Sequence, residues 1–280
     1  MEIKNIINTI DSLAPLSDAI VNIQKLYTQD TNDLNIDTLV SLIESDALLS
    51  VNILKIANSS VYGFSSKISS VSQAVTLFGI MQIYGFIMSY VVSKSIRANT
   101  EIFGYSNEKF NDVCNIQSAL LLQWYSKIDL ETARFLAPLA LIMETGKLVI
   151  ATEVIESSYE DEFRVGYKKS VDIQAYEKEI LGKTSYELSS MIFKHWNLEP
   201  IYIKVLEKLD ADVVANENIK SYVEIMKIII IAANVKSVLT KESVLKACSQ
   251  VKGMGLDPNE FANVALKVKK AYINGLKKEV

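Results

Sequence analysis

The sequence predicts an all-α fold, and three observations support this prediction. Glycine and proline together number 14 among 280 residues, about half of their usual share, so the chain has few turn-forming residues. Apolar residues make up 49% of the chain, which is enough for a sizeable core, and they recur at the spacing of helices that bury one face. No segment shows the apolar and polar alternation of a strand bounded by turns.

Two short helices are predicted near the N-terminus, over residues 36–43 and 47–58. Asn35 precedes the first helix as its N-cap. The apolar stripe of this helix consists of Ile36, Leu39, Val40 and Ile43. The second helix ends at Asn58, where polar residues interrupt its pattern. We expect its apolar face to contain Leu48, Val51 and Leu54.

A capping box predicts the start of the next helix. The Ser70 hydroxyl can accept the backbone N–H three residues later, while Gln73 reaches back to the backbone of Ser70. The helix should end at Gly79, because glycine best takes the left-handed conformation after a helix. A longer apolar helix is then predicted from about Met81 to Ile96.

The polar, turn-rich segment 99–110 marks a boundary between two lobes. We therefore assign residues 1–100 to an N-terminal helical lobe and residues 101–280 to a second helical lobe with a C-terminal extension. The apolar periodicity of the second lobe predicts helices near 108–127, 131–153, 172–181, 185–195, 198–209, 217–239 and 241–252. A last helix begins at Asp257-Pro258, a typical helix start. Its face toward the core should hold Phe261, Val264, Ala265 and Val268.

Composition and targeting signals exclude several classes of protein. The chain has 29 basic and 33 acidic residues and a pI of about 5.3, which is untypical of a nucleic-acid-binding protein. Residues 1–10 lack the basic start and the small-residue cleavage site of a signal peptide. The longest apolar stretch, at 228–235, is too short to span a membrane. We therefore expect a cytoplasmic protein with no nucleic-acid or membrane partner.

Few residues are suited to metal or nucleophilic chemistry. The only histidine is His195, whereas zinc enzymes, two-metal hydrolases and histidine-activated nucleophiles generally need several converging ligands or bases. We expect its ring to pack beside Trp196 near a helix end. Cys114 and Cys248 fit no metal-binding spacing, so we expect two reduced, buried thiols.

Neither a phosphate-binding loop nor a catalytic pair of carboxylates can be identified in the sequence. Gly182-Lys183-Thr184 does not complete a P-loop, because the position that requires the earlier glycine is Glu177. The carboxylate pairs lie in charge runs that we expect to be exposed to solvent, namely Glu177 with Glu179 and Asp161 with Glu162. We therefore expect no catalytic residue, no metal and no cofactor.

Three stretches of the chain resemble the HDOD domain, a family of bacterial domains related to the HD and HD-GYP phosphohydrolases. LAPLSDAIVNIQKL at 13–26 is similar to the family's Leu-Pro-Pro-Leu-Pro opening, with Ala14 and Ser17 replacing two prolines. The most specific stretch is 42–79, which contains ANSSVYGF and ISSVSQAVTLFG and has Ala in place of a proline at position 47. The third is HWNLE at 195–199. The resemblance covers about residues 10–210 and implies a two-lobed helical fold.

The resemblance also identifies candidate residues in the second stretch. Asn58 and Gly63 are expected to shape a turn, and Tyr62 and Phe64 are expected to anchor it. Some of these four residues are also candidates for lining a groove between the lobes that contacts a partner.

Catalytic relatives hold a metal with a His-Asp pair followed by Gly-Lys, and the matching stretch here is METGK at 143–147. Methionine replaces the histidine, and a thioether with a lysine cannot rebuild a site for a hard divalent metal. Other ligand positions of the family fall at Gln117, at Ser185 and around 208–210. The candidate vestigial pocket therefore consists of Gln117, Met143, Glu144, Lys147 and Ser185.

The missing ligands and the resemblance favour a non-catalytic bacterial regulatory domain that acts by binding signalling proteins. The alternative is a sensor whose vestigial pocket binds a nucleotide or cyclic dinucleotide, with Lys147 meeting a phosphate. A surface ion pair with a nearby acid is the simpler interpretation of Lys147. A phosphohydrolase is the third alternative, and a homodimer formed through an exposed helix face stays open.

Overall fold

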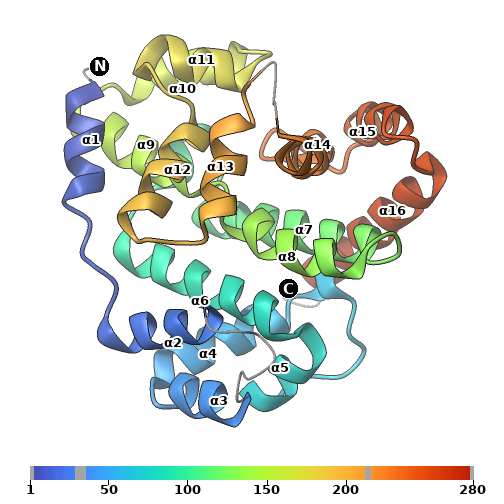
Figure 1. The fold of residues 1–280 in the computed structure, drawn as a ribbon. Coiled ribbons are helices and arrows are strands. Elements are labelled where there is room, and N and C mark those ends of the chain that lie inside the picture. Colours follow the sequence, from blue (N-terminus) through green and yellow to red (C-terminus); the bar gives the residue numbers. More distant parts are fainter. Residues whose placement is uncertain (1–2, 29–35, 212–215, 278–280) are drawn as a thin grey trace. The chain divides into compact units, whose positions relative to one another are not determined.

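The computed structural model describes residues 3–28, 36–211 and 216–277, and it confirms the all-α fold. Within these residues the β-structure is a two-stranded antiparallel ladder between β1 (Ala233–Asn234) and β2 (Ser237–Val238). Everything else that is regular is helical (Figure 1). The helical fold therefore follows from the shortage of turn residues and the helical periodicity of the apolar ones.

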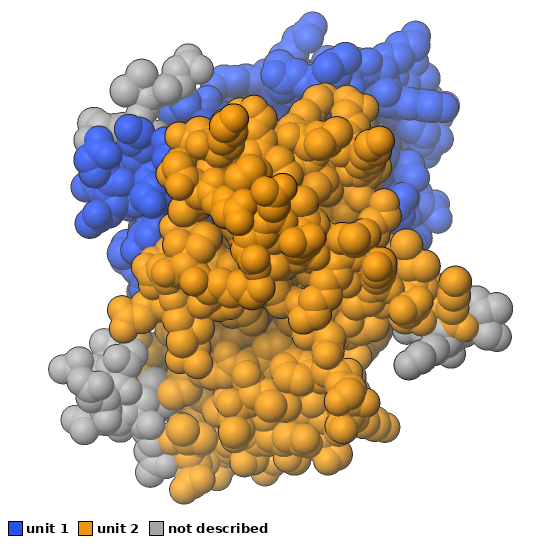
Figure 2. All heavy atoms as spheres, turned by 90° about the vertical axis from the view of Figure 1, so that its right-hand side faces the viewer, with its two compact units in different colours: residues 1–15, 92–114, 143–227 blue, residues 16–91, 115–142, 228–280 orange. Residues whose placement is uncertain are grey.

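The chain forms two compact units, which Figure 2 distinguishes by colour. Unit 1 comprises residues 1–15, 92–114 and 143–227, and unit 2 comprises 16–91, 115–142 and 228–280. The helices wholly within unit 1 are α1 (Ile3–Asp11), η3 (Thr100–Phe103), α9 (Thr145–Glu156), α10 (Glu160–Lys169), α11 (Ile173–Leu181), α12 (Ser185–His195) and α13 (Pro200–Lys208). The division predicted at residue 100 falls inside one of the stretches of unit 1.

The helices wholly within unit 2 are α2 (Asp18–Thr28), α3 (Ile36–Glu44), α4 (Ala47–Ala57), η2 (Ser60–Tyr62), α5 (Val71–Phe78), α8 (Leu130–Ile142), α15 (Lys241–Gly253) and α16 (Pro258–Leu276). Three further helices run from one unit into the other along the chain, namely α6 (Ile80–Ser95), α7 (Asn107–Tyr125) and α14 (Glu217–Ala232). Neither unit is therefore a single stretch of sequence.

Unit 1 is built on the close approach of α9 and α12. A Cβ atom at Gly146, in the first turn of α9, would lie 1.9 Å from the backbone oxygen of Ser185. Only glycine allows this separation. Aromatic rings fill the neighbouring core, where Phe103 contacts Phe163 and Tyr167 edge-on.

Unit 2 contains the predicted C-terminal helix, and its core face is confirmed. Phe261, Val264, Ala265 and Val268 are buried, and the ring of Phe261 packs edge-on against Trp124 with centroids 4.8 Å apart. The carboxylate of Asp257 caps α16 by accepting the N–H of Asn259. The side chain and the proline at the first helical position thus start α16 as the sequence predicts.

Details of the N-terminal helices differ from expectation. The buried face of α4 is Leu49, Ile53 and Ala57, whereas Leu48 and Val51 are 63% and 62% exposed, so the predicted face was wrong. Ser70 caps α5 through the N–H of Gln73, but the Gln73 side chain accepts the N–H of Ser69 rather than that of Ser70. The Asn35 cap lies outside the described residues.

Gly79 ends α5 with φ 76° and ψ 164°, which is a positive φ but not the left-handed helical conformation that we expected. The Gly79 N–H nevertheless closes the helix by donating to the carbonyl of Val75.

Two predictions for later helices, 131–153 and 217–239, were wrong, and one helix was missed. The helix predicted over 131–153 is two helices, α8 and α9, separated at Met143 and Glu144. The helix α10 was not predicted. The helix α14 ends at Ala232, because the Asn234 side chain accepts the N–H groups of Lys236 and Ser237 and turns the chain into the β1–β2 hairpin.

Among the described residues, the helical stretch that is long and apolar enough to cross a membrane is Leu130–Glu156, and not the one near residue 228. Its length and composition would suffice to cross a membrane, but 89% of its most apolar window is buried inside the protein. This burial is typical of helices in a protein core. Both cysteines are free, with Cys114 buried as expected and Cys248 only partly buried.

Candidate functional site

The turn between α4 and α5 is held by one amide side chain. The Nδ2 of Asn58 donates to the carbonyl of Ile68 at 2.8 Å, and its Oδ1 accepts the N–H of the same residue at 2.9 Å. Gly63 has φ 76° in the left-handed region, where a side chain would be strained. Asn58 and Gly63 therefore shape this turn, as expected from the resemblance.

Two aromatic residues of the turn differ in exposure. Tyr62 is buried and packs edge-on against Phe78 at 4.8 Å. Phe64 contacts the same ring at 5.2 Å but remains 43% exposed. Both rings therefore anchor the turn in unit 2, and Phe64 also presents apolar surface to solvent.

The break between α8 and α9 positions the polar residues of unit 1. The Ser189 hydroxyl of α12 donates to the carbonyl of Met143 at 2.7 Å, and the N–H of Gly146 donates to that hydroxyl at 2.8 Å. Glu144 occupies the N-cap position of α9, but its side chain does not cap the helix. Contrary to the prediction, Glu144 thus lies in a tight turn between the two helices, and its carboxylate points away from the N-terminus of α9.

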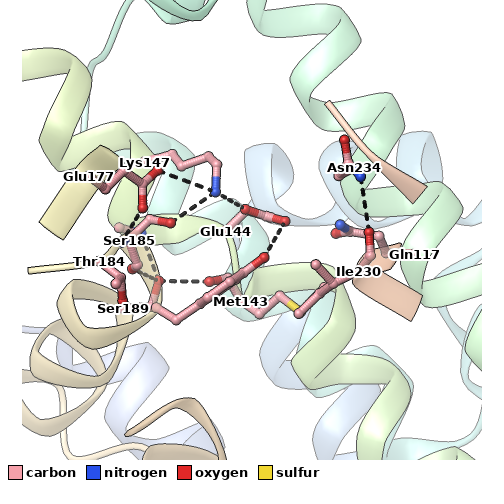
Figure 3. Close-up of polar contacts among 12 residues, drawn as sticks. Gln117, Met143, Glu144, Lys147, Glu177, Thr184, Ser185, Ser189, Ile230 and Asn234 are labelled. Carbon is pink, nitrogen blue, oxygen red and sulfur yellow. Dashed lines mark hydrogen bonds and ion pairs between the residues drawn. The ribbon is translucent and has the colours of Figure 1, made fainter. Parts of the chain in front are cut away.

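The carboxylate of Glu144 points to a buried ammonium group (Figure 3). The Nζ of Lys147 lies 2.7 Å from Glu144 Oε2, 2.9 Å from the Ser185 hydroxyl and 3.8 Å from Glu177 Oε1. The side chains of the two glutamates and the lysine are at most 3% exposed. We call these four residues the Lys147 cluster.

Two further contacts complete the cluster. The N–H of Ser185 donates to Glu177 Oε2 at 2.7 Å, which ties α11 to the start of α12. The ring of Tyr186 lies beneath the ammonium of Lys147, with 5.1 Å from Nζ to the ring centroid. Each carboxylate therefore has at least one hydrogen-bond donor. The ammonium of Lys147 has two hydrogen-bond acceptors, a second carboxylate and an aromatic ring around it.

The charges of the cluster influence one another strongly. Burial raises the pKa of Glu177 above its ordinary value, although Lys147 and the bonds from Ser185 oppose this effect. Burial alone would lower the pKa of Lys147, but the charges of Glu144 and Glu177 outweigh it and hold the pKa well above the usual range. The lysine is therefore an ammonium ion at any physiological pH.

Two expectations for these residues were wrong. Glu177 is fully buried rather than solvated, and Lys147 forms a buried ion pair rather than a surface one. A sequence signal for Glu177 exists, because it is four residues from both Ile173 and Leu181 and therefore shares the inward face of α11. Glu179, Asp161 and Glu162 are exposed, as predicted.

The structure brings together three of the five residues of the candidate pocket, namely Glu144, Lys147 and Ser185. Met143 contributes its carbonyl rather than its side chain. Gln117 belongs to unit 2, where its Nε2 donates to the carbonyl of Ala233 at 2.8 Å. Near the expected ligand position at 208–210, Asp210 accepts a hydrogen bond from Thr184.

The residues of the cluster do not fit a divalent metal. Such a site needs several carboxylate or imidazole ligands and no competing cation. Here an ammonium group already sits between the two carboxylates. Across the part of the chain that the structure describes, no three histidine, cysteine or acidic side chains converge as metal ligands. The arrangement instead forms a buried polar core in which one ammonium group faces two carboxylates.

Two side chains of the resemblance segment 195–199 form hydrogen bonds with backbone carbonyls at the start of segment 13–26. His195 Nε2 lies 2.9 Å from the carbonyl of Leu13, and the indole N–H of Trp196 donates to the carbonyl of Ala14 at 3.1 Å. His195 is at the end of α12, as expected. Both side chains therefore fix the N-terminal segment of unit 1.

The Gly182-Lys183-Thr184 segment is a junction between two helices. Gly182 is the left-handed C-cap of α11, and Thr184 forms a capping box with Glu187 at the start of α12. The segment does not follow a strand, as a P-loop would.

Comparison with known proteins supports the fold and the family. Structures with similar folds include an HDOD domain protein from Geobacter sulfurreducens, which is 14% identical with a TM-score of 0.63 over 98% of this chain and 94% of that one. A proposed phosphohydrolase from Shewanella amazonensis is 16% identical, with a TM-score of 0.70 over 95% and 97%. A virulence factor from Campylobacter jejuni is 19% identical, with a TM-score of 0.58 over 96% and 98%.

The sequence identities of 14–19% to these solved structures are too low to transfer an activity. No curated protein sequence matches the chain. The family model of the HDOD domain matches residues 13–210, which is more than half of the sequence and includes the turn between α4 and α5 and the Lys147 cluster. The chain therefore belongs to the HDOD domain family.

Proposed function

We propose that this HDOD protein is a non-catalytic regulatory protein of the cytoplasm that acts by binding other proteins. The observation that carries this proposal is the Lys147 cluster. Its two carboxylates are buried, and both face the ammonium group of Lys147 in the same chain. Metal-dependent hydrolysis requires carboxylates that face a metal and a substrate. In this protein the two carboxylates are buried and face a lysine, so they can meet neither a metal nor a substrate.

The cluster also weighs against the nucleotide-sensor alternative. A phosphate that approached Lys147 would have to displace Glu144, which lies 2.7 Å from its ammonium. It would also have to enter a region where the side chains are at most 3% exposed. Removing one partner from such a buried pair costs about 3–5 kcal/mol. This cost would offset most of the favourable free energy of phosphate binding.

Two assays test the non-catalytic role. Purified protein is incubated with bis(p-nitrophenyl) phosphate and manganese, magnesium or nickel, and it is screened by thermal shift against cyclic dinucleotides and mononucleotides. We expect neither turnover nor a shift. A ligand at 100 times its Kd would stabilise the protein by about 2.7 kcal/mol, which such a screen detects.

Turnover that disappears in Glu144→Gln would contradict the proposal, because it would make this carboxylate a catalytic group. A thermal shift that disappears in Lys147→Met would instead establish the sensor. Protein binding is tested by affinity capture from the native host with the wild type and with Phe64→Ala. We expect at least one captured protein to depend on this exposed ring.

A further inference from the structure

The C-terminal part of the chain carries a net positive charge, although the chain as a whole is acidic. Residues 228–277 of unit 2 contain eight lysines and three acidic residues, a net charge of +5. Residues 1–227 carry a net charge of −9, and residues 278–280 carry zero, which gives the total of −4. Such a charge asymmetry within an acidic chain indicates an anionic partner for the basic part.

The exposed side of α16 combines lysines with aliphatic residues. Leu266, Ile273 and Leu276 are 50%, 40% and 44% exposed. Lys267, Lys270 and Lys277 are also exposed. Leu266, Lys270, Ile273 and Lys277 follow one another at intervals of four, three and four residues, so they form a single stripe along the helix. We call the six exposed residues the basic-aliphatic face.

The lysines of this face have no acidic partners among the described residues. The acidic residues of the segment are engaged elsewhere: Glu242 pairs with Lys246 at 2.7 Å, and Glu260 pairs with Lys127. Asp257 caps the N-terminus of α16. The described residues therefore leave the positive charge of the face without an acidic partner.

We propose that the basic-aliphatic face of α16 binds the surface of an anionic phospholipid bilayer. Aliphatic side chains that alternate with lysines can enter the headgroup region while the ammonium groups meet the lipid phosphates. Each lysine near an anionic leaflet strengthens binding about fivefold, which corresponds to about 1 kcal/mol. The inference does not rest on the proposed non-catalytic role, and it departs from the expectation of no membrane partner.

The composition of the face favours a bilayer over the other anionic surfaces. Protein interfaces are enriched in aromatic residues, methionine and arginine and depleted of lysine, whereas this face consists of lysine, leucine and isoleucine. A nucleic acid would leave the three aliphatic side chains against phosphates, and the face has no aromatic or arginine side chain to contact bases.

The experiment is co-sedimentation of the full-length protein with vesicles. Vesicles of equal parts phosphatidylglycerol and phosphatidylcholine are compared with vesicles of phosphatidylcholine alone. We expect binding to the anionic vesicles only, and weaker binding as salt is added. The triple variant Lys267→Gln/Lys270→Gln/Lys277→Gln should bind about 100-fold more weakly. Leu266→Asn/Ile273→Asn should also bind more weakly, because lysines alone do not enter the headgroup region.

A matched control removes three exposed lysines from other parts of the chain. Lys55→Gln/Lys67→Gln/Lys168→Gln changes the net charge equally and should bind like the wild type. Equal losses in the two triple variants would overturn the proposal, as would a lack of binding to anionic vesicles. Binding to a DNA duplex without binding to vesicles would identify a nucleic-acid surface instead. Circular dichroism of each variant confirms that it is folded.

Discussion

Lys147 places a charged ammonium group in the interior of unit 1. A lysine ammonium in a protein interior is costly unless its charge is balanced and its hydrogen bonds are made. Glu144 and Ser185 supply these bonds at 2.7 and 2.9 Å, and Glu177 adds a second negative charge at 3.8 Å. The three charged residues therefore depend on one another, since loss of any one leaves the others buried without compensation.

Replacing this lysine with an apolar residue of similar length should destabilise the protein. We expect Lys147→Met to lower the free energy of unfolding by about 3–5 kcal/mol, because both carboxylates lose their buried counter-charge. Urea denaturation at neutral pH measures the change. The loss should shrink as the pH falls toward 5, because burial raises the pKa of Glu177, and its carboxyl group costs less to bury once it is protonated.

Lys194→Met provides the comparison. Lys194 pairs with Glu207 at the surface, where the two side chains are 55% and 36% exposed, and exposed pairs contribute about 0–1 kcal/mol. A loss in Lys147→Met no larger than that in Lys194→Met would mean that the buried ion pair does not hold unit 1 together.

The sequence allowed only part of this cluster to be predicted. The resemblance identified Glu144, Lys147 and Ser185, because they occupy the positions of a known motif. Glu177 was missed, since its neighbours Lys178 and Glu179 give the segment a charged composition. Its helical phase relative to Ile173 and Leu181 was the relevant signal, but phase alone does not reveal which buried cation a carboxylate meets.

At the scale of elements, Gly146 determines how closely α9 and α12 pack. We expect Gly146→Ala to destabilise the protein by about 1–3 kcal/mol or more, because the new Cβ would overlap the backbone oxygen of Ser185. Backbone atoms cannot move aside as a flexible side chain can. The free energy of unfolding, measured in urea, tests this expectation.

Gly253→Ala is the matched control for this substitution. Gly253 is the last residue of α15, and a Cβ there would meet no atom within 4 Å. Alanine in a helix is favoured over glycine by up to about 1 kcal/mol, so this variant should be neutral or slightly stabilised. Equal effects of the two substitutions would show that helix propensity, rather than the close approach at Gly146, determines the result.

Helix ends were predictable where a side chain or proline defines them, as at Asp257 and Ser70. They were not predictable where tertiary contacts decide. The break at Met143 and Glu144 contains no helix-breaking residue, and it is held by the Ser189 hydroxyl from another helix. The face of α4 was misjudged because this helix carries apolar residues on more than one side, so periodicity alone did not select the buried one.

At the scale of the whole molecule, the buried weak acids determine the response to alkaline pH. Burial raises the pKa of Tyr27, Tyr105, Tyr167 and Tyr186 above the ordinary value near 10. It likewise raises the pKa of the Cys114 thiol. At a pH between the unfolded and the folded pKa of such a group, the folded protein keeps the proton and the unfolded chain has lost it. Stability must therefore fall as the pH rises above the unfolded pKa values.

We expect stability to be constant near neutral pH and to decline from about pH 9, where thiols begin to ionise in the unfolded chain. Each group that stays protonated only in the folded state costs about 1.4 kcal/mol per pH unit. Four tyrosines would together remove about 6 kcal/mol by pH 11, one unit above their pKa in the unfolded chain. This loss is comparable to the whole stability of many domains, so the protein should unfold near pH 11.

Urea midpoints measured from neutral pH upward test this expectation, together with tyrosine absorbance, which reports ionisation directly. The variant Tyr27→Phe should show a shallower decline, because one titrating group has been removed from the unfolded chain. A midpoint that stays unchanged to about pH 11, with the tyrosines ionising at their ordinary pKa, would mean that these rings are accessible to water. The packed cores of the two units would then be looser than their burial indicates.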